Sequence, residues 1–394
     1  MASSSSSTAQ HLLLSPAELA YLHTALSLAP PVRPDGRTAA QFRPLTAETG
    51  ILPAANGSAR VCFADGTEAV VGVKAEVEKR RVLPLSRVYY ENKELRRKGG
   101  EARDEQMQED GGLDGEDAVA GENDWVEITV EVPGYRDDDS STVFLATMLS
   151  EALLADGEFT KKLWINRRFH WKLYIDIILI SPPLSYPLPL LSLTTHLALL
   201  STRLPGLKSE ADEDPMFDDD WDASQFIYPR QGSDTTSATV RSRPPVTLLV
   251  MAVGDNIIFD PSKEELAVAD SALAVSVGER NVSSDEASET MDVDGELQTG
   301  RHLRLLSVRT IDPPSRLTAP GVPNAVNAAA WGQGVPAAKD PGARAAETDD
   351  VEGVWKAPRG GTKVAVLGAM VQKVLEKGGI ADEVLDGLDA VDLG

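Results

Sequence analysis

The chain has 394 residues, a formal net charge of -23 and a single cysteine, Cys62. A chain of this length holds one large domain or two ordinary ones, and its negative charge argues against a surface that is basic throughout and suited to nucleic acid. One cysteine excludes an intramolecular disulfide framework and a CxxC metal site, so we expect a reducing compartment.

Two segments bear on a secretory or membrane route. Residues 1–14 form a serine-rich tail that lacks the basic and apolar regions of a secretory signal, and we expect this tail to be disordered. The longest apolar stretch, Leu173–Leu200, contains Asp176 and four prolines. A spanning helix broken in this way would leave backbone groups unpaired in lipid, so the stretch is predicted to be buried core.

The segment before residue 78 predicts a helix, a tight turn and a hairpin. A capping box with proline at the first helical position opens the helix at Ser15, and leucines at helical spacing continue it to Leu28. Arg33-Pro34-Asp35-Gly36-Arg37 has the chemistry of a turn. Two β-prone runs, Ala59–Phe63 and Ala69–Ala75, flank an Asp-Gly pair, which is a strong hairpin signal.

Three motifs in this segment resemble, in order, the N-terminal signature of RNase PH-like subunits of the RNA exosome. They are R-P-D-G-R at Arg33–Arg37, E-T-G-I-L-P-A-A-N-G-S-A-R-V at Glu48–Val61 and G-T-E-A-V-V-G-V-K-A-E at Gly66–Glu76. A later segment, Asp260–Glu265, reads D-P-S-K-E-E and resembles a segment of exosome subunits. The resemblance implies structural roles for the signature residues, which are Arg33, Asp35, Gly36, Arg37, Asn56, Gly57, Ser58, Lys74, Glu76, Asp260 and Pro261.

An insertion, a strand and a helix are predicted next. Residues 78–123 lack apolar periodicity and are predicted to be solvated. Within them Arg96, Arg97 and Lys98 either contact RNA phosphates or lie in an exposed loop. From Trp125 onward apolar and polar residues alternate, which predicts a half-buried strand. Val143–Ala155 has the spacing of an amphipathic helix, with Phe144 among its apolar positions.

The apolar stretch itself divides into a strand and a helix. Lys172–Ser181 is nearly continuously apolar, which is typical of a strand covered on both faces. Asp176 within it is either half of a carboxylate metal site or a paired structural residue, and the lack of a partner acid favours the second. Leu190–Leu204 is predicted to be a buried helix.

An acidic run and a second hairpin follow. Glu210–Asp222 has eight carboxylates in thirteen residues without EF-hand spacing, so a solvated loop is a better interpretation than a cation site. The runs Val246–Ala252 and Asn256–Phe259 flank Gly254-Asp255 and predict a hairpin. Ser262 is predicted to cap a short helix, with acidic residues in its first turn.

The C-terminal region alternates between regular elements and loops. Ala272–Val277 predicts a strand, and after an acidic loop at 278–300, Leu303–Thr310 predicts a strand or a helix. Residues 311–362, rich in Ala, Gly and Pro, are typical of a linker. Lys363–Lys377 predicts a terminal helix that docks on the protein's own surface or on a neighbour.

The residues do not predict a cofactor or a metal site, because the five histidines are scattered. In active members of the family that the chain resembles, phosphorolysis needs arginines on a helix and a turn rich in Asp and Gly. Here the corresponding helix segment, Ser150–Leu154, has Glu151 and no arginine, and the turn Ser181–Pro187 has three prolines, no Asp and no Gly. Prolines remove N–H donors that would hold phosphate, so the resemblance implies a subunit that has lost its catalytic activity.

The resemblance further implies an α+β domain of RNase PH-like fold, which has two related β-α halves and resembles domain 2 of ribosomal protein S5. The domain covers residues 15–310, with long acidic loop insertions at about 78–123, 206–240 and 278–300, and residues 363–394 form a helical extension. The implied partners are other RNase PH-like subunits in a six-membered ring, S1- and KH-type cap proteins, a hydrolytic nuclease and RNA. The implied location is the nucleus, nucleolus and cytoplasm.

Three questions stay open at this level. The basic residues Lys161, Lys162, Arg167 and Arg168 either line an RNA channel or lie in an exposed loop. The first alternative to a scaffolding subunit is an active phosphorolytic 3′ to 5′ exoribonuclease. The second alternative is an acidic adaptor that binds basic proteins through its loops, for which Glu210–Asp222 would be essential.

Overall fold

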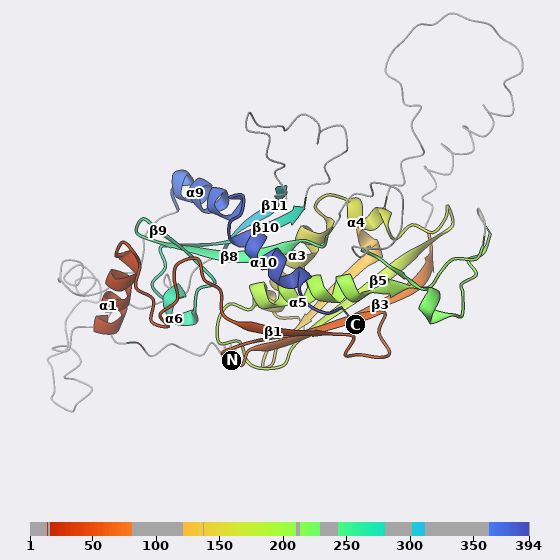
Figure 1. Cartoon of the computed structure of the whole chain (residues 1–394), viewed down its shortest axis with the longest axis horizontal. Coiled ribbons are helices and arrows are strands. Elements are labelled where there is room, and N and C mark those ends of the chain that lie inside the picture. Colours follow the sequence, from red (N-terminus) through yellow and green to blue (C-terminus); the bar gives the residue numbers. More distant parts are fainter. Residues whose placement is uncertain are drawn as a thin grey trace, which may run out of the picture.

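Figure 1 shows the computed structural model, which describes residues 14, 16–80, 121–136, 138–209, 213–228, 243–279, 302–311 and 362–393. The helices are α1 Pro16–Ser27, η1 Asn123–Trp125, α3 Ser140–Leu154, α4 Glu158–Lys161, α5 Leu188–Ser201, η2 Trp221–Ala223, α6 Lys263–Leu266, α9 Val364–Val374 and α10 Ile380–Asp389. The strands are β1 Leu45–Thr49, β2 Gly57–Phe63, β3 Glu68–Lys79, β4 Val126–Glu131, β5 Phe169–Leu179, β6 Arg203–Leu204, β7 Gln225–Phe226, β8 Val246–Val253, β9 Asn256–Phe259, β10 Ser271–Glu279 and β11 Leu303–Ile311. The architecture is therefore α+β.

The first sheet contains five strands in the order β1-β2-β3-β5-β4. The predicted hairpin is confirmed as β2 and β3, with Gly66 in the left-handed region at φ 85°. The predicted alternation is confirmed in β4, which pairs parallel to β5. Strand β1 was not predicted, because it is a short edge strand with little burial and its sequence, LTAET, has only one large apolar residue.

The second sheet contains four strands in the order β11-β10-β8-β9. The second predicted hairpin is confirmed as β8 and β9, with Gly254 at φ 58°. Of the two alternatives for Leu303–Thr310, the structure has the strand, β11, which pairs antiparallel to β10. Both β8 and β10 are almost entirely buried.

The helix α5 joins the two sheets into one core. It packs against β1, β2, β3 and β5 of the first sheet and against β8 of the second (Figure 1). All of its side chains are buried, including Ser192, Thr194 and His196, because its leucines fall on every side of the helix and pack against both sheets. The helix ends at Ser201, before the predicted Leu204, because Arg203–Leu204 forms β6.

The prediction that β5 is covered on both faces is wrong at its C-terminal end. Ile178 is 41% exposed and Ile180 is 53% exposed, while the alternate residues of the strand are buried. Asp176 lies on the same open face and accepts a hydrogen bond from Thr129 Oγ1 at 2.6 Å, which favours the paired structural interpretation. Within the described ranges, His, Cys, Asp and Glu do not form a group of three or more that could hold a metal ion.

The outer helices differ from their predictions in detail. Helix α1 has the predicted extent, although its cap, Ser15, lies outside the described residues. Helix α3 begins at Ser140, where Asp139 accepts a hydrogen bond from Ser141 N at 2.9 Å. Phe144 is exposed rather than buried, because it faces away from the sheet.

The C-terminal helices dock on the protein's own surface. Helix α9 contacts β8 and β10, and its Met370 and Val374 are fully buried. Helix α10 lies within the region predicted as a helical extension, residues 363–394, and follows Gly378 and Gly379, after the helix predicted at Lys363–Lys377. Thr49 Oγ1 donates a hydrogen bond to the Asp392 carbonyl at 3.0 Å, so the end of the chain returns to β1.

The predicted insertions are only partly described. Residues 81–120, 229–242, 280–301 and 312–361 lie outside the described residues, as does the tail at 1–13. Within the predicted insertion at 206–240, however, Ile227 and Tyr228 are buried in the core. Within the described residues, the structure has no helix long and apolar enough to cross a membrane.

His196 on α5 predicts a loss of stability in acid. The side chain is 1% exposed, and burial lowers its pKa from 6.5 to about 4. The unfolded chain therefore takes up a proton near pH 6.5 that the folded chain excludes, so this contribution to stability is complete above pH 6.5 and is lost as the pH falls towards 4. We expect a loss on the order of 3 kcal/mol from this residue. Chemical denaturation at a series of pH values should show a shallower acid slope in His196→Gln than in the native protein, and equal slopes would contradict the assignment.

Candidate functional site

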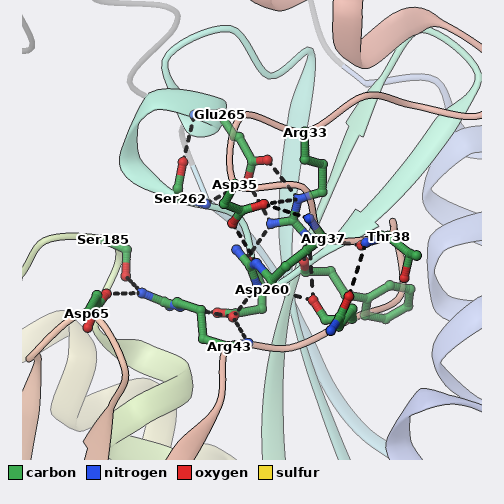
Figure 2. Close-up of polar contacts among 12 residues, drawn as sticks. Arg33, Asp35, Arg37, Thr38, Arg43, Asp65, Ser185, Asp260, Ser262 and Glu265 are labelled. Atoms are coloured by element: carbon green, nitrogen blue, oxygen red, sulfur yellow. Dashed lines mark hydrogen bonds and ion pairs between the residues drawn. The ribbon is translucent and has the colours of Figure 1, made fainter.

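The turn at Arg33–Arg37 forms a buried polar cluster with the segment Asp260–Glu265 (Figure 2). The side chain of Arg33 is fully buried, and its Nε and Nη2 donate to the two carboxylate oxygens of Glu265 at 2.7 and 2.8 Å. The same guanidinium donates to the carbonyls of Phe259 and Asp260 at 3.1 and 2.9 Å. An arginine fork matched to a carboxylate is the strongest form of such a pair.

The short helix α6 holds Glu265 in place. Ser262 Oγ accepts from Glu265 N at 3.3 Å, and Ser262 N donates to Glu265 Oε2 at 2.7 Å, which completes the capping box. The predicted cap at Ser262 is therefore confirmed. The ion pair with Arg33 was not predicted, because the two residues are 232 positions apart.

Asp260 connects the remaining arginines of the cluster. One of its carboxylate oxygens accepts from Arg37 Nη1 at 2.8 Å, and the other accepts from Arg43 Nη2 at 2.6 Å. Asp260 has a backbone φ of 46°, in the left-handed region that residues other than glycine rarely adopt. Surrounding contacts must maintain this conformation. Arg43 also donates to Asp65 at 2.6 Å and to Ser185 Oγ at 2.9 Å, so the cluster reaches the first hairpin and the turn after β5 (Figure 2). Sequence reasoning missed Arg43, which no motif marks.

The second signature motif fastens the end of α5 to the first sheet. Asn56 Nδ2 donates to the Arg203 carbonyl at 3.1 Å, and Asn56 Oδ1 accepts from Ala75 N at 2.9 Å. Ser58 N donates to Ser201 Oγ at 3.1 Å, and the same hydroxyl donates to the Ser58 carbonyl. A Cβ on Gly57 would lie 2.5 Å from the Thr202 Cα, so only glycine allows this approach.

The remaining signature residues are more exposed. Asp35 accepts from Arg37 Nε at 2.5 Å, and Gly36 takes the left-handed conformation of the turn at φ 75°. Lys74 and Glu76 lie on the open face of β3, with their charged groups 3.8 Å apart. Pro261 precedes the cap of α6.

The predicted basic cluster is largely engaged within the protein. Lys161 forms an ion pair with Glu158 at 2.6 Å, and Arg168 pairs with Asp214. Lys162 turns inward, with its buried ammonium 3.7 Å from the centre of the Tyr228 ring, and burial lowers its pKa to about 8. Arg167 is exposed, whereas Arg96, Arg97 and Lys98 lie outside the described residues.

A groove of about 860 Å³ lies between α3 and β4, where the helix segment Ser150–Leu154 faces the sheet. Among the residues that the structure describes, its lining includes Glu131, Glu151 and Asp176 and contains no Lys, Arg or His. Glu151 also accepts from Arg309 Nε on β11 at 2.9 Å. A phosphate anion needs cations and N–H donors, so this groove does not suit it.

The turn after β5 is occupied by structural contacts. Ser181 Oγ accepts from Glu68 N at 3.1 Å, and Ser185 accepts from Arg43. Neither residue lines the groove. The segments that would have to converge for phosphorolysis therefore do not share this groove.

The fold has two sheets around a buried helix, and residues of the signature motifs make buried contacts. These features define an α+β protein of the RNase PH-like class. The chain is 32% identical over 281 residues to exosome complex component rrp42 of Schizosaccharomyces pombe, covering 67% of this chain and 78% of that protein. It is 28% identical over 277 residues to exosome complex component RRP42 of Saccharomyces cerevisiae, covering 69% and 84%. The chain belongs to the RRP42 family of exosome complex components.

The comparisons with family models and solved structures add little to this family assignment. No protein-family model matches the chain. An archaeal exosome core matches with TM-score 0.45 and 18% identity, covering 74% of this chain and 84% of that one. The Archaeoglobus fulgidus exosome with RNA bound to the active site matches with TM-score 0.45 and 19% identity, covering 74% and 86%. Both scores lie below 0.5, so the family assignment rests on the sequence relatives.

Proposed function

We propose that the chain is a non-catalytic ring subunit of the RNA exosome, which scaffolds 3′ to 5′ RNA processing and decay, including ribosomal RNA maturation. Membership of the RRP42 family supports the place in the exosome. The observation that supports the loss of catalysis is the groove at α3, whose described lining has three carboxylates, one of them paired with Arg309, and no Lys, Arg or His. A phosphate attacking an anionic RNA backbone needs positive charge that these residues do not supply.

The proposal includes the finer features of fold and assembly. The domain at 15–310 has the RNase PH-like fold with two related halves and acidic insertions, followed by a linker and the helical extension. It joins other RNase PH-like subunits in a six-membered ring, with S1- and KH-type caps and a hydrolytic nuclease, in the nucleus, nucleolus and cytoplasm.

Direct RNA contact by this chain is a separate part of the proposal. RNA passes through the assembled channel, where exposed cations would bind the phosphate backbone without reading sequence. The candidates are Lys161, Lys162, Arg167 and Arg168, together with Arg96, Arg97 and Lys98. Of the first four, Lys161 and Arg168 form ion pairs with Glu158 and Asp214, and Lys162 turns inward to the Tyr228 ring.

The function is tested by purification and by an RNA decay assay. Native mass spectrometry of the tagged protein should detect other RNase PH-like subunits. The isolated chain, incubated with single-stranded RNA and phosphate, should release no nucleoside diphosphates above a no-enzyme control, while an active phosphorolytic exoribonuclease does so in parallel. Phosphate-dependent release by the isolated chain would support the phosphorolytic alternative and contradict the proposal.

A further inference from the structure

The edge of the first sheet at β4 is unpaired within the described residues. Strand β4 lies last in the order β1-β2-β3-β5-β4 and pairs with β5 on one side only. Among the described residues, the backbone groups of Glu127–Glu131 make no hydrogen bond outside this pairing. Only alternate residues of an edge strand bond to its neighbour, so the others direct their N–H and C=O groups away from the sheet. These groups are available to a further strand.

The groove beside α3 follows this free edge. Its lining takes the four consecutive residues Ile128–Glu131 from β4, and consecutive residues of a strand point to opposite faces of the sheet. The lining also includes Asp176, on the open face of β5, and residues of α3, which packs between this sheet and the second one. The groove therefore extends around the edge of β4 from one face of the sheet to the other.

Helix α3 presents small side chains to the groove. The lining contains Ala146, Thr147 and Ser150, which are three and four positions apart and so lie on one stripe of the helix. Leu145 and Leu149 are instead buried in the core. The small side chains leave a trough of about 860 Å³ beside the strand. Strand β4, with 6 residues, is about 20 Å long, and α3, with 15, is about 22 Å long, so an added strand of similar length fits between them.

The groove is negatively charged on the open face of the sheet. Of its three carboxylates, Glu151 pairs with Arg309, whereas Glu131 and Asp176 form no ion pair with any described residue. Both of these lie on the open face, where Glu131 is in register with the exposed Ile178. Lysine and arginine complement such a surface, while the phosphates of RNA are repelled by it.

We infer that the β4 edge binds an extended segment of a partner protein in which basic residues alternate with apolar ones. The segment adds a strand to the first sheet, and its backbone pairs with β4. Every second side chain is basic and faces Glu131 and Asp176, and the side chains between them lie against the small residues of α3. Such a partner goes beyond the proposed function, because neither membership of the ring nor the loss of catalysis requires it.

The test measures binding of the full chain to a fluorescein-labelled peptide of alternating valine and lysine, by fluorescence anisotropy. Two further peptides carry N-methyl groups, either on all valines or on all lysines. Alternate N–H groups of a strand point to opposite edges, so one N-methylated peptide should lose at least about tenfold in affinity while the other binds like the parent. A peptide with glutamate in place of lysine should not bind, because the carboxylates of the groove repel it.

Thr147→Trp fills the trough without changing its charge. We expect it to weaken peptide binding about tenfold or more at any salt concentration, since the added strand loses its contact with α3. The matched control is Thr24→Trp on α1. Both threonines are exposed on a helix, and each donates a hydrogen bond of 2.8 Å to the carbonyl four positions earlier. The control should bind like the native chain.

Glu131→Gln with Asp176→Asn removes the charge and keeps the shape of the groove. We expect roughly tenfold weaker binding at low salt and a much smaller loss at high salt, where charges are screened. Asp255→Asn with Glu264→Gln, at exposed positions outside the groove, should bind like the native chain at both salt concentrations.

Several outcomes would overturn the inference. They are no peptide binding by the native chain, equal losses in the two N-methylated peptides, equal losses in a variant and its control, or displacement of the peptide by single-stranded RNA. A native dimer in sedimentation velocity that Thr147→Trp dissociates would assign the groove to a second copy of this chain and overturn it too. Co-purification of ring subunits with the native chain tests the proposed function separately, so failed peptide binding beside an intact complex rejects the β4 contact alone.

Discussion

Glu265→Ala is expected to lower the free energy of unfolding by about 3–5 kcal/mol. The substitution leaves the fully buried guanidinium of Arg33 without its counter-charge, and the remaining carbonyl partners satisfy hydrogen bonds but do not neutralise it. The capping box of α6 is lost as well, which adds about 1 kcal/mol. Urea denaturation at neutral pH, followed by tryptophan fluorescence, measures the effect.

Two further variants separate the charge from the helix. Glu264→Ala, one position earlier and exposed, should change stability by less than about 0.5 kcal/mol. Arg33→Met with Glu265→Leu should recover part of the loss, because replacing both members of a buried pair removes the uncompensated charge. A double variant as unstable as Glu265→Ala would show that the charge is not the cause.

Gly57→Ala is expected to destabilise the protein by about 3 kcal/mol or more, at the upper end of the range for overpacking a core. The new Cβ would lie 2.3 Å from Thr202 Oγ1, 2.5 Å from Thr202 Cα and 2.7 Å from the Ala198 carbonyl. Two of these atoms are backbone at the end of α5, which is buried between the two sheets and has little room to move. Thermal unfolding of the variant should show a corresponding fall in Tm.

Gly368→Ala is the matched control for this prediction. A Cβ at Gly368 on α9 meets nothing within 4 Å, so the helix should gain up to about 1 kcal/mol from the better helix former. The two Gly→Ala changes should therefore have opposite signs. Equal Tm values for Gly57→Ala and the native protein would contradict the close approach of α5 to β2.

Both predictions concern contacts that join distant parts of the chain. The sequence predicted the local conformation of the signature motifs but not their long-range contacts. The motif at Arg33–Arg37 was correctly predicted to be a turn, which Pro34, Asp35 and Gly36 specify locally. Its main structural role, the burial of Arg33 against Glu265, depends on a residue 232 positions away. Similarly, nothing near Gly57 in the sequence shows that Thr202 lies against it.

The sequence by itself determined the elements whose cause is local. The Asp-Gly and Gly-Asp turns predicted both hairpins, the alternation after Trp125 predicted β4, and Ser262 predicted the cap of α6. Each depends on the conformational preferences or side-chain periodicity of a few adjacent residues, which are present before the chain folds. Helix α5 belongs with them, since leucines that fall on every side of a helix predict its burial.

Only the tertiary structure decided which faces those elements bury and which charges they bring together. The outer face of β5 is open at Ile178 and Ile180 because α5 packs against only the opposite face of the sheet. Lys161 and Arg168, predicted either to line an RNA channel or to lie in an exposed loop, pair with Glu158 and Asp214, and within the insertion predicted at 206–240 Phe217 packs against Trp171. Burial and ion pairing depend on which segments meet in space, and that is set by the packing of the whole chain.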